Sequence, residues 1–399
     1  MNHRLRWFVL FMVFIATGLN FLDRQVLSVV IIKIQREFNI TEVQYGIINT
    51  SFLVGYAIMF TVAGRLIDIF GGKIGLGLSV GLWSVANCLH GVVGNFNQLV
   101  ASRFLLGIGE GGCFPGAVKT VNDWFSLRQR ALANGIAIGG AAIGAVIAPP
   151  LTIYLASDFG WRWAFVIPGL IGVLWVLTWV LIPRSKGIPR EQRVTSESAV
   201  MPLYSLLKSR EALSFILIRF LLDPVVYFVM FWVPKYLHEV RQVSFERIGE
   251  LFWIPFLALG VSNIVGGWIS DRLITNQFPV RSARRTVMGS AALMTMSAPF
   301  IATVSSAEIA VALMALFMFA HGFWITNYIT SISDVFGEKG TATVVGLSGT
   351  AGALSSLIIN PLIGVFVQHY SYTPLWSATG ILYPIAFIIF ITNIKYKSK

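Results

Sequence analysis

Charge is scarce in this sequence. Only 12% of its 399 residues are Asp, Glu, Lys or Arg, whereas 56% are hydrophobic and the mean hydropathy is +0.74. Soluble domains carry about 25% charged residues, so this chain has about half the charge needed to cover a water-facing surface. The composition excludes a soluble globular protein and predicts an integral membrane protein.

Cysteine is almost absent, and enzyme motifs are missing. Cys88 and Cys113 both lie in apolar runs, which excludes a disulfide framework and a paired-cysteine metal site. The chain has no HExxH or GxSxG motif, and residues 71–73 lack the rest of a P-loop. Residues 107–112 fit GxGxxG, but they lie in an apolar run with no preceding strand. We therefore expect no enzyme activity, no metal and no cofactor.

Long apolar runs are what the sequence has in abundance. A membrane-spanning helix needs about 20 mostly apolar residues. The sequence predicts twelve such spans, near residues 7–32, 44–65, 74–94, 97–119, 132–156, 161–183, 212–235, 247–270, 286–304, 308–331, 342–367 and 373–394. The first span is too long for a signal peptide and no small-residue cleavage site follows it, so we expect a retained anchor. The predicted fold is an all-α integral membrane protein with twelve transmembrane helices.

Basic residues are distributed unevenly between the two faces. Of the 30 Lys and Arg residues, 21 fall on the face that carries the termini, six on the opposite face and three within spans. This asymmetry places both termini in the cytoplasm. The net charge of +12 is then mostly a consequence of topology, so we expect the lipid bilayer and not nucleic acid as the partner of these charges.

The two halves of the chain repeat each other at an offset of 203 residues. The matched pairs are Gly46 with Gly249, Gly64 with Gly267, and Asp68 with Asp271. The longest polar stretch separates the halves, which predicts an N-terminal six-helix bundle at 1–183, a cytoplasmic linker at 184–210 and a C-terminal six-helix bundle at 211–399. Two six-span repeats are typical of secondary transporters, whose substrate site lies at mid-membrane between the repeats.

Six charged residues lie inside the predicted spans, where ionisable groups are costly and mark functional sites. They are Asp23, Arg24, Arg103, Glu110, Arg219 and Asp223. Arg103 and Glu110 are two helical turns apart and share a face, and Arg219 and Asp223 are four residues apart and can pair directly. The alternative is that these groups are structural ion pairs between helices. His90 and His321 are two further intramembrane candidates, with helix packing as the alternative.

The loop after the second span resembles the signature of the major facilitator superfamily. That signature is Gly-x-Leu-x-Asp-(Arg)-x-Gly-(Arg)-Lys, and residues 64–73 match it except at the two bracketed basic positions. The resemblance implies two pseudo-symmetric six-helix halves. It also implies a cytoplasmic gate at Asp68, Asp271 and Arg272, where carboxylates accept N–H bonds at helix starts and pair with arginines.

Further motifs are similar to those of the anion:cation symporters, a group that includes bacterial hexuronate and galactonate transporters, sialin and vesicular glutamate transporters. The motifs are Asn20-Phe-Leu-Asp23-Arg24, Gly55-Tyr56, Arg103-Phe-x-x-Gly107-x-x-Glu110, Asp123-Trp124-Phe125 with Arg130-Ala131, and Gly160-Trp-Arg-Trp-Ala-Phe165. The resemblance is specific in the N-terminal half and thin in the C-terminal half. It implies a multi-pass protein of the plasma membrane, with the bacterial inner membrane as the expected location.

The resemblance also implies roles for individual residues. Arg24 and Arg219 would bind the substrate carboxylate, and Tyr56 would help to hold the substrate. Asn49, at the place of a second-helix histidine, is a further candidate for substrate binding. The residues expected to take part in proton coupling are Asp23, Arg103, Glu110 and Asp223, although the family offers no role for Asp223. A glutamine that aldonate carriers have in the fifth helix falls near Gly140 or Ala141 here, which argues against an aldonate.

The chemistry of the intramembrane residues supports the same roles. Arg offers a two-pronged site for a carboxylate, and a carboxyl group beside it can exchange a proton when the anion arrives. Hydroxyl and amide contacts for a polyol or sugar acid would come from Tyr56 with Asn327, Thr330 and Ser331, for which water contacts are the alternative.

The sequence therefore predicts a secondary active transporter that imports a small organic anion, such as a hexuronate or another carboxylate, with protons by alternating access. We expect a monomer. Alternatives are an organic anion exchanger, an exporter of hydrophobic compounds, or a non-transporting receptor on a transporter scaffold. The presence of both Asp23 and Glu110 favours proton-coupled transport.

Overall fold

The computed structural model describes residues 3–125, 127–183 and 203–395. Within these ranges a few side chains also lie outside the description, at positions 3, 61, 64, 65, 68, 127–132, 203, 338, 339 and 342. All regular elements in the described ranges are helices. The predicted all-α architecture is confirmed.

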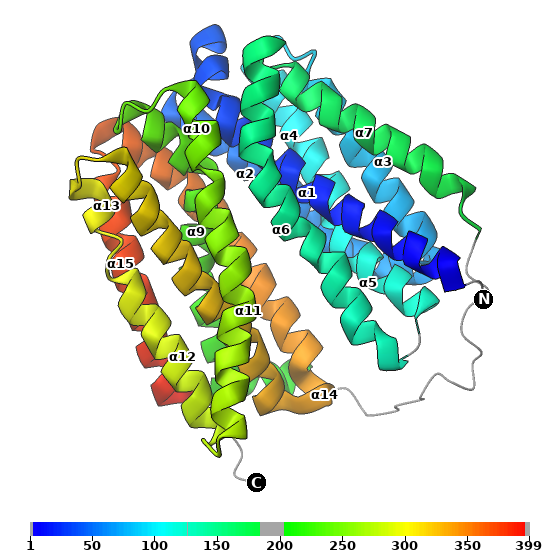
Figure 1. Cartoon of the computed structure of the whole chain (residues 1–399), viewed down its shortest axis with the longest axis vertical. Coiled ribbons are helices and arrows are strands. Elements are labelled where there is room, and N and C mark those ends of the chain that lie inside the picture. Colours follow the sequence, from blue (N-terminus) through cyan, green and yellow to red (C-terminus); the bar gives the residue numbers. More distant parts are fainter. Residues whose placement is uncertain (1–2, 126, 184–202, 396–399) are drawn as a thin grey trace. The chain divides into compact units, whose positions relative to one another are not determined.

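Fifteen helices are present in the described residues (Figure 1). Their bounds are α1 His3–Phe38, α2 Glu42–Phe70, α3 Gly72–His90, α4 Phe96–Gly111, α5 Cys113–Trp124, α6 Leu127–Asp158, α7 Trp163–Leu181, α8 Leu203–Lys208, α9 Arg210–Glu239, α10 Phe245–Leu251, α11 Trp253–Thr275, α12 Val280–Thr295, α13 Phe300–Thr303, α14 Ala307–His369 and α15 Thr373–Asn393.

Proline and glycine explain why the helices do not correspond one to one with the predicted spans. Pro115 has no N–H to donate to the Gly111 carbonyl, and the fourth span is divided there into α4 and α5. Gly337 has φ 59° and ψ −163°, so α14 is in fact two helices that meet at a sharp kink (Figure 1). These two helices correspond to the predicted tenth and eleventh spans.

Every predicted span contains helix in the described residues, but fewer than twelve helical segments meet the length and hydropathy that a membrane crossing needs. Ten described helical segments are long and apolar enough to cross a membrane. The two predicted spans that are not among them belong to α3, which carries several polar residues, and to the divided pair α4 and α5. The membrane-spanning character is therefore confirmed, and the count of twelve stays a prediction.

The chain forms two compact units. Unit 1 takes in residues 1–195 and 244–253, and unit 2 takes in 196–243 and 254–399. Most of the predicted linker lies outside the described residues, although α8 and the start of α9 fall within it. Residues 244–253 belong with unit 1 because α10 packs against α6, where Gly249 meets Ile153.

Each unit is a bundle of paired helices. In unit 1, α1 lies along α6 (Figure 1), α2 packs on α4, and α3 packs on both α4 and α7. In unit 2, α14 packs on α9 and α12, and α15 packs on the same two helices. Several helices begin at a polar residue whose side chain accepts a backbone N–H, as Thr41 does at the start of α2 and Asn95 at the start of α4.

Glycines bring the helices of unit 1 into backbone contact. A Cβ atom on Gly144 of α6 would lie 2.0 Å from the Gly18 carbonyl oxygen of α1, and one on Gly107 of α4 would lie 2.1 Å from the Phe52 carbonyl oxygen of α2. Small residues four apart predict such close approach. For the pair Gly135 and Gly139 that prediction is wrong, since no atom of the described residues lies within 4 Å of either Cβ position.

We expect Gly144→Ala to destabilise the protein by about 1–3 kcal/mol, because overpacking a close helix contact costs about that much. The obstructing Gly18 carbonyl is backbone and cannot swing away. Gly139→Ala is the matched control on the same helix. Thermal unfolding of the purified protein in detergent measures both variants, and an equal melting temperature for the two would contradict the contact.

Candidate functional site

A buried ion pair joins α1 to α4 in the middle of unit 1. Arg24 Nε donates to Glu110 Oε2 at 3.0 Å, and Arg24 Nη2 lies 2.9 Å from the same oxygen. Arg24 is 4% exposed and Glu110 is fully buried. Arg24 Nη2 also donates to Asn20 Oδ1 at 3.3 Å, one turn earlier on α1. The sequence placed Glu110 on one face with Arg103, but its ion-pair partner is Arg24.

Three aromatic rings surround the Arg24 guanidinium. Its Cζ lies 4.9 Å from the ring centroid of Phe21, 5.3 Å from that of Phe52 and 4.8 Å from that of Tyr56. Tyr56 stacks on Phe52 at 5.9 Å, so the two rings from α2 form one continuous wall. The rings attract the cation and exclude water from it. Tyr56 was predicted to help hold the substrate, and that role stays a prediction. No role was predicted for Phe21 and Phe52, which are ordinary apolar residues in an apolar run.

Asp23 points to a different part of unit 1, because neighbouring residues of a helix are about 100° apart around its axis. It is 1% exposed, and its Oδ1 accepts a hydrogen bond from Asn87 Nδ2 of α3 at 2.9 Å. The second N–H of that amide donates to the Phe165 carbonyl oxygen of α7 at 3.1 Å. Sequence reasoning did not select Asn87, although an amide inside an apolar span was a usable signal.

Arg103 is a second buried cation near the same carboxylates. It is 1% exposed, and its Cζ lies 5.8 Å from the Phe165 ring centroid. Its charge interacts electrostatically with Glu110 and Asp23. Asn49 is also buried in unit 1, on α2. Unit 1 thus brings together Asp23, Arg24, Arg103 and Glu110, two cations and two anions, away from bulk water.

In unit 2, Arg219 and Asp223 form an ion pair on α9. Arg219 Nε lies 2.6 Å from Asp223 Oδ1, and Arg219 Nη2 donates to Asp223 Oδ2 at 2.7 Å. The two residues therefore pair directly, as their spacing predicted. The Arg219 side chain is 23% exposed and the Asp223 side chain 12%. A Cβ on Gly352 of α14 would lie 1.9 Å from Asp223 Oδ2, so the carboxylate occupies space that only a glycine leaves.

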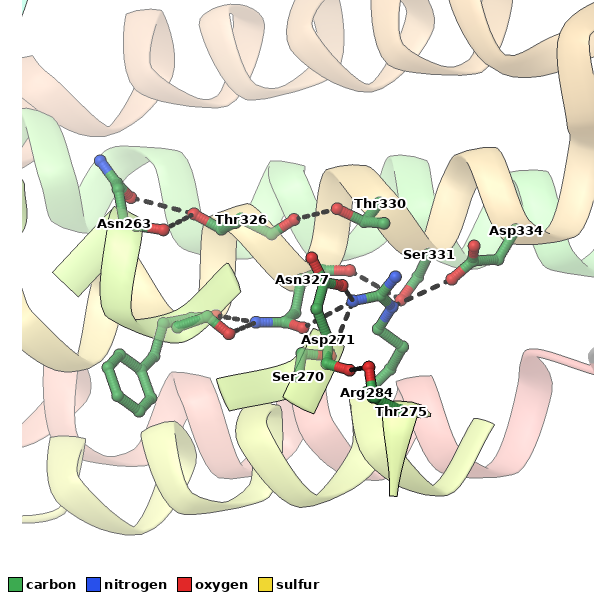
Figure 2. A network of polar contacts seen from close by, with 12 residues as sticks. Asn263, Ser270, Asp271, Thr275, Arg284, Thr326, Asn327, Thr330, Ser331 and Asp334 are labelled. Atoms are coloured by element: carbon green, nitrogen blue, oxygen red, sulfur yellow. Dashed lines mark hydrogen bonds and ion pairs between the residues drawn. The ribbon is translucent and has the colours of Figure 1, made fainter. Parts of the chain in front are cut away.

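A separate polar network in unit 2 centres on Arg284 of α12 (Figure 2). Arg284 Nε donates to Asp334 Oδ2 of α14 at 3.0 Å, and Nη1 donates to Ser270 Oγ of α11 at 2.7 Å. The predicted gate residue Asp271 lies 3.6 Å from Nη1. Arg284 therefore fastens three helices together.

The other predicted gate residues are not part of the network around Arg284 as the structure describes it. Arg272 is exposed in the last turn of α11, and Asp271 pairs with Arg284 instead of this neighbour. Asp68 belongs to α2, and its side chain lies outside the described part of the structure. No role was predicted from the sequence for Arg284 or Asp334.

The three polar residues proposed from the tenth span are bonded within unit 2. Asn327 donates to the Gly266 and Phe323 carbonyl oxygens at 3.2 and 3.0 Å, and its Oδ1 accepts from Arg284 at 3.4 Å (Figure 2). Thr330 and Ser331 donate to the carbonyl oxygens four residues earlier on their own helix. Their role as substrate ligands stays a prediction.

The chain is similar over nearly its whole length to bacterial carriers of sugar acids. It is 27% identical over 410 residues to the hexuronate transporter of Escherichia coli strain K12, covering 98% of this chain and 95% of that protein. It is 26% identical over 417 residues to the D-galactonate transporter of Escherichia coli O6:H1, covering 98% and 97%. It is 29% identical over 381 residues to the hexuronate transporter of Bacillus subtilis, covering 92% and 88%.

Solved structures share the fold. A bacterial homologue of the human lysosomal transporter Spinster, in its inward-facing and occupied conformation, superposes with a TM-score of 0.81 at 20% identity, covering 98% of this chain and 97% of the other. A D-xylose-proton symporter gives 0.80 at 13% identity, covering 97% and 98%. The family model described as Major Facilitator Superfamily matches residues 13–360. The predicted resemblance is confirmed, and the chain belongs to this superfamily of membrane transporters.

Proposed function

We propose that this protein is a secondary active transporter that imports a sugar acid of the hexuronate class together with protons. The observation that carries the proposal is the buried Arg24–Glu110 pair inside its aromatic enclosure. The names of two similar proteins, the hexuronate transporters of Escherichia coli and Bacillus subtilis, support the substrate class. Arg24 supplies a fixed cation with the planar geometry that a carboxylate requires.

Charge balance explains why a proton accompanies the anion. With all four groups ionised, Asp23, Arg24, Arg103 and Glu110 sum to zero net charge. A substrate carboxylate adds one negative charge to a poorly hydrated region, which is unfavourable. If the carboxylate replaces Glu110 on Arg24, the freed Glu110 takes up a proton and the balance returns to zero. Anion binding and proton binding are then linked, because each favours the state that accepts the other.

In unit 2, Arg219 and Asp223 form a second arginine–carboxylate pair that an anion can open in the same way. An arriving carboxylate or hydroxyl group competes for the guanidinium, and the released Asp223 can take up a proton. The pair is more exposed than Arg24 and Glu110, which makes it easier to open. The alternative is that the salt bridge between Arg219 and Asp223 is permanent and only stabilises α9.

The aromatic enclosure around Arg24 suits a sugar acid. Phe21, Phe52 and Tyr56 present apolar ring faces on which the C–H face of a polyol chain can pack, while the carboxylate meets the guanidinium. An anion exchanger remains the alternative function, but it does not need buried carboxylates that bind protons. A receptor on a transporter scaffold would need only the binding site. We place the protein in the inner membrane of a bacterium, as a monomer with both termini in the cytoplasm.

A thermal-shift screen of the purified protein tests the substrate class. Sugar acids, dicarboxylates and amino acids are added separately, since a ligand that binds only the folded state raises its melting temperature. We expect hexuronates to stabilise the protein most. Stabilisation by amino acids and by no sugar acid would contradict the proposed class.

Arg24→Ala is expected to abolish substrate binding and uptake together, since it removes the fixed cation. Arg24→Lys should weaken binding by about tenfold or more, because a point charge has neither the two-pronged geometry nor the flat face that packs on the rings. Isothermal titration with the best ligand of the screen measures both variants.

The matched control for Arg24→Lys is Arg162→Lys. Arg162 also pairs with a glutamate, Glu37, but both side chains are more than one third exposed. Exposed ion pairs contribute little, so Arg162→Lys should lower the substrate affinity only slightly. Near wild-type affinity in Arg24→Ala would show that Arg24 is structural.

Glu110→Gln is expected to separate binding from proton coupling. The amide has the shape of the protonated acid but cannot release a proton. Proton-driven accumulation in liposomes should disappear, while counterflow exchange of substrate continues. Loss of exchange in a folded variant would mean that Glu110 serves the binding site itself, and unchanged accumulation would move the proton role to Asp23.

Asp223→Asn distinguishes competition from a permanent bridge in unit 2. Under competition the substrate binds as tightly or more tightly, because Arg219 is freed, while proton-driven accumulation weakens. Gly352→Ala should act in the same direction by displacing the carboxylate, whereas Gly349→Ala, with nothing within 4 Å of its Cβ position, should resemble the wild type. Restoration of transport by neutralising both Arg219 and Asp223 would favour the bridge and remove the substrate role of Arg219.

A further inference from the structure

Unit 1 contains a group of deeply buried polar atoms with no hydrogen-bond partner among the described residues. The atoms are Asp23 Oδ2, Asn87 Oδ1, His90 Nε2, Arg103 Nε and Nη2, and Glu110 Oε1. All five residues are at most 1% exposed. An unpaired buried polar atom costs about 1–3 kcal/mol, and native proteins keep few of them. So many unpaired polar atoms in one helix bundle indicate that a polar ligand or solvent molecule forms hydrogen bonds with them.

Three of these residues, Asn87, His90 and Arg103, meet at Phe165 of α7. Asp23 joins them through Asn87, and Glu110 interacts electrostatically with Asp23 and Arg103. The His90 ring stacks on the Phe165 ring at 4.7 Å, and the Arg103 Cζ lies 5.8 Å from the same ring. Asn87 reaches the Phe165 carbonyl oxygen with one N–H and Asp23 with the other. Since both of these contacts are acceptors, the amide must present its NH₂ to them, which leaves its oxygen facing elsewhere.

The cluster extends along the bundle from one end to the middle. His90 is the last residue of α3, and the loop after it is exposed at Val92. Arg103 lies about two turns inside α4, and Glu110 lies seven residues further, about 10 Å at 1.5 Å per residue. His90 Nδ1 is bonded to the Ala86 carbonyl oxygen at 2.7 Å, so Nε2 is the ring atom that remains.

The mixture of groups identifies what can fill the cluster. Arg103 offers only donors and would repel a cation, whereas Asp23 and Glu110 offer acceptors and would repel an anion. Water both donates and accepts, and it fits a buried site that has two to four polar partners. The charges of Arg24 and Arg103 balance those of the two carboxylates, and α7 has no ionisable residue between 163 and 181.

We propose that these residues hold a chain of ordered water molecules inside unit 1, which carries protons between the α3–α4 end of the bundle and the carboxylates of Asp23 and Glu110. The inference rests on the proposed proton coupling and adds its route. A proton enters the chain near His90, each water passes one proton on, and a carboxylate receives one, so no other reactant is needed. In the predicted orientation the α3–α4 end faces outward. Protons then reach the carboxylates through unit 1 itself.

Hydroxyl-radical footprinting of the full-length protein in detergent tests for the water directly. Radicals made from bound water oxidise the side chains beside it. We expect Phe165 to be oxidised although it is fully buried, whereas Phe215 of unit 2, equally buried among aromatic rings, is not. Equal protection of the two phenylalanines would overturn the proposal whether or not the protein is coupled to protons.

His90→Phe tests the function of the chain, because it keeps a ring against Phe165 and removes Nε2. In liposomes with an internal pH dye, substrate-driven proton entry should fall about tenfold or more, while substrate affinity and counterflow exchange stay within about twofold. His90→Gln retains a polar atom to bind water and should keep more proton entry than His90→Phe.

His321→Phe is the matched control, since His321 is a buried histidine of unit 2 hydrogen-bonded to Tyr383 at 2.7 Å. Undiminished proton entry in His90→Phe, or an equal loss in His321→Phe, would overturn the proposed route. If the wild-type protein itself shows no proton entry with substrate, the proposed function fails instead.

Discussion

The buried ion pair between Arg24 and Glu110 is the constraint on which the arrangement of unit 1 depends. An isolated charge in a poorly hydrated interior is too costly to keep, so each must be balanced nearby. Arg24 has Glu110, and Arg103 has the combined field of Glu110 and Asp23. Because the set is neutral only as a whole, adding one anion disturbs every member of it. Under the proposed function, such a set responds to an arriving anion through its protons, which a lone arginine could not do.

The buried arginines of the two units have different surroundings. In unit 2, Arg284 is held by Asp334, Ser270, Asn327 and Asp271 from two neighbouring helices (Figure 2). Such a residue fixes helix ends. Arg24 instead pairs with Glu110 and Asn20 in the middle of unit 1, and three aromatic rings lie around its guanidinium. The surroundings of the two arginines therefore differ: Arg284 joins three helices through polar side chains, whereas Arg24 lies against aromatic rings.

The sequence predicted the helices, the pairing of Arg219 with Asp223 and the importance of the intramembrane charges, because cost in lipid and spacing on a helix depend only on local sequence. It could not predict that Glu110 pairs with Arg24, 86 residues away, since that depends on how α1 and α4 pack. It also assigned no contact to Asn87 or Phe165, whose roles arise from packing between helices. Glycine spacing has the same limit as a predictor of helix contacts. Gly107 and Gly144 lie at close helix contacts, whereas Gly135 and Gly139, which have the same spacing of four, have no such contact among the described residues.

Helix packing and site chemistry are joined at one place on α4. Gly107 and Gly111 lie on either side of Glu110 in the sequence, and Cβ atoms there would meet the backbone of Phe52 and Tyr56 on α2. These are the same two residues whose rings face Arg24. The close approach that the glycines permit therefore sets the distance between the aromatic wall and the ion pair. Any movement of α2 along α4 shifts the rings relative to the guanidinium, so the occupancy of the site and the packing of these two helices cannot change independently.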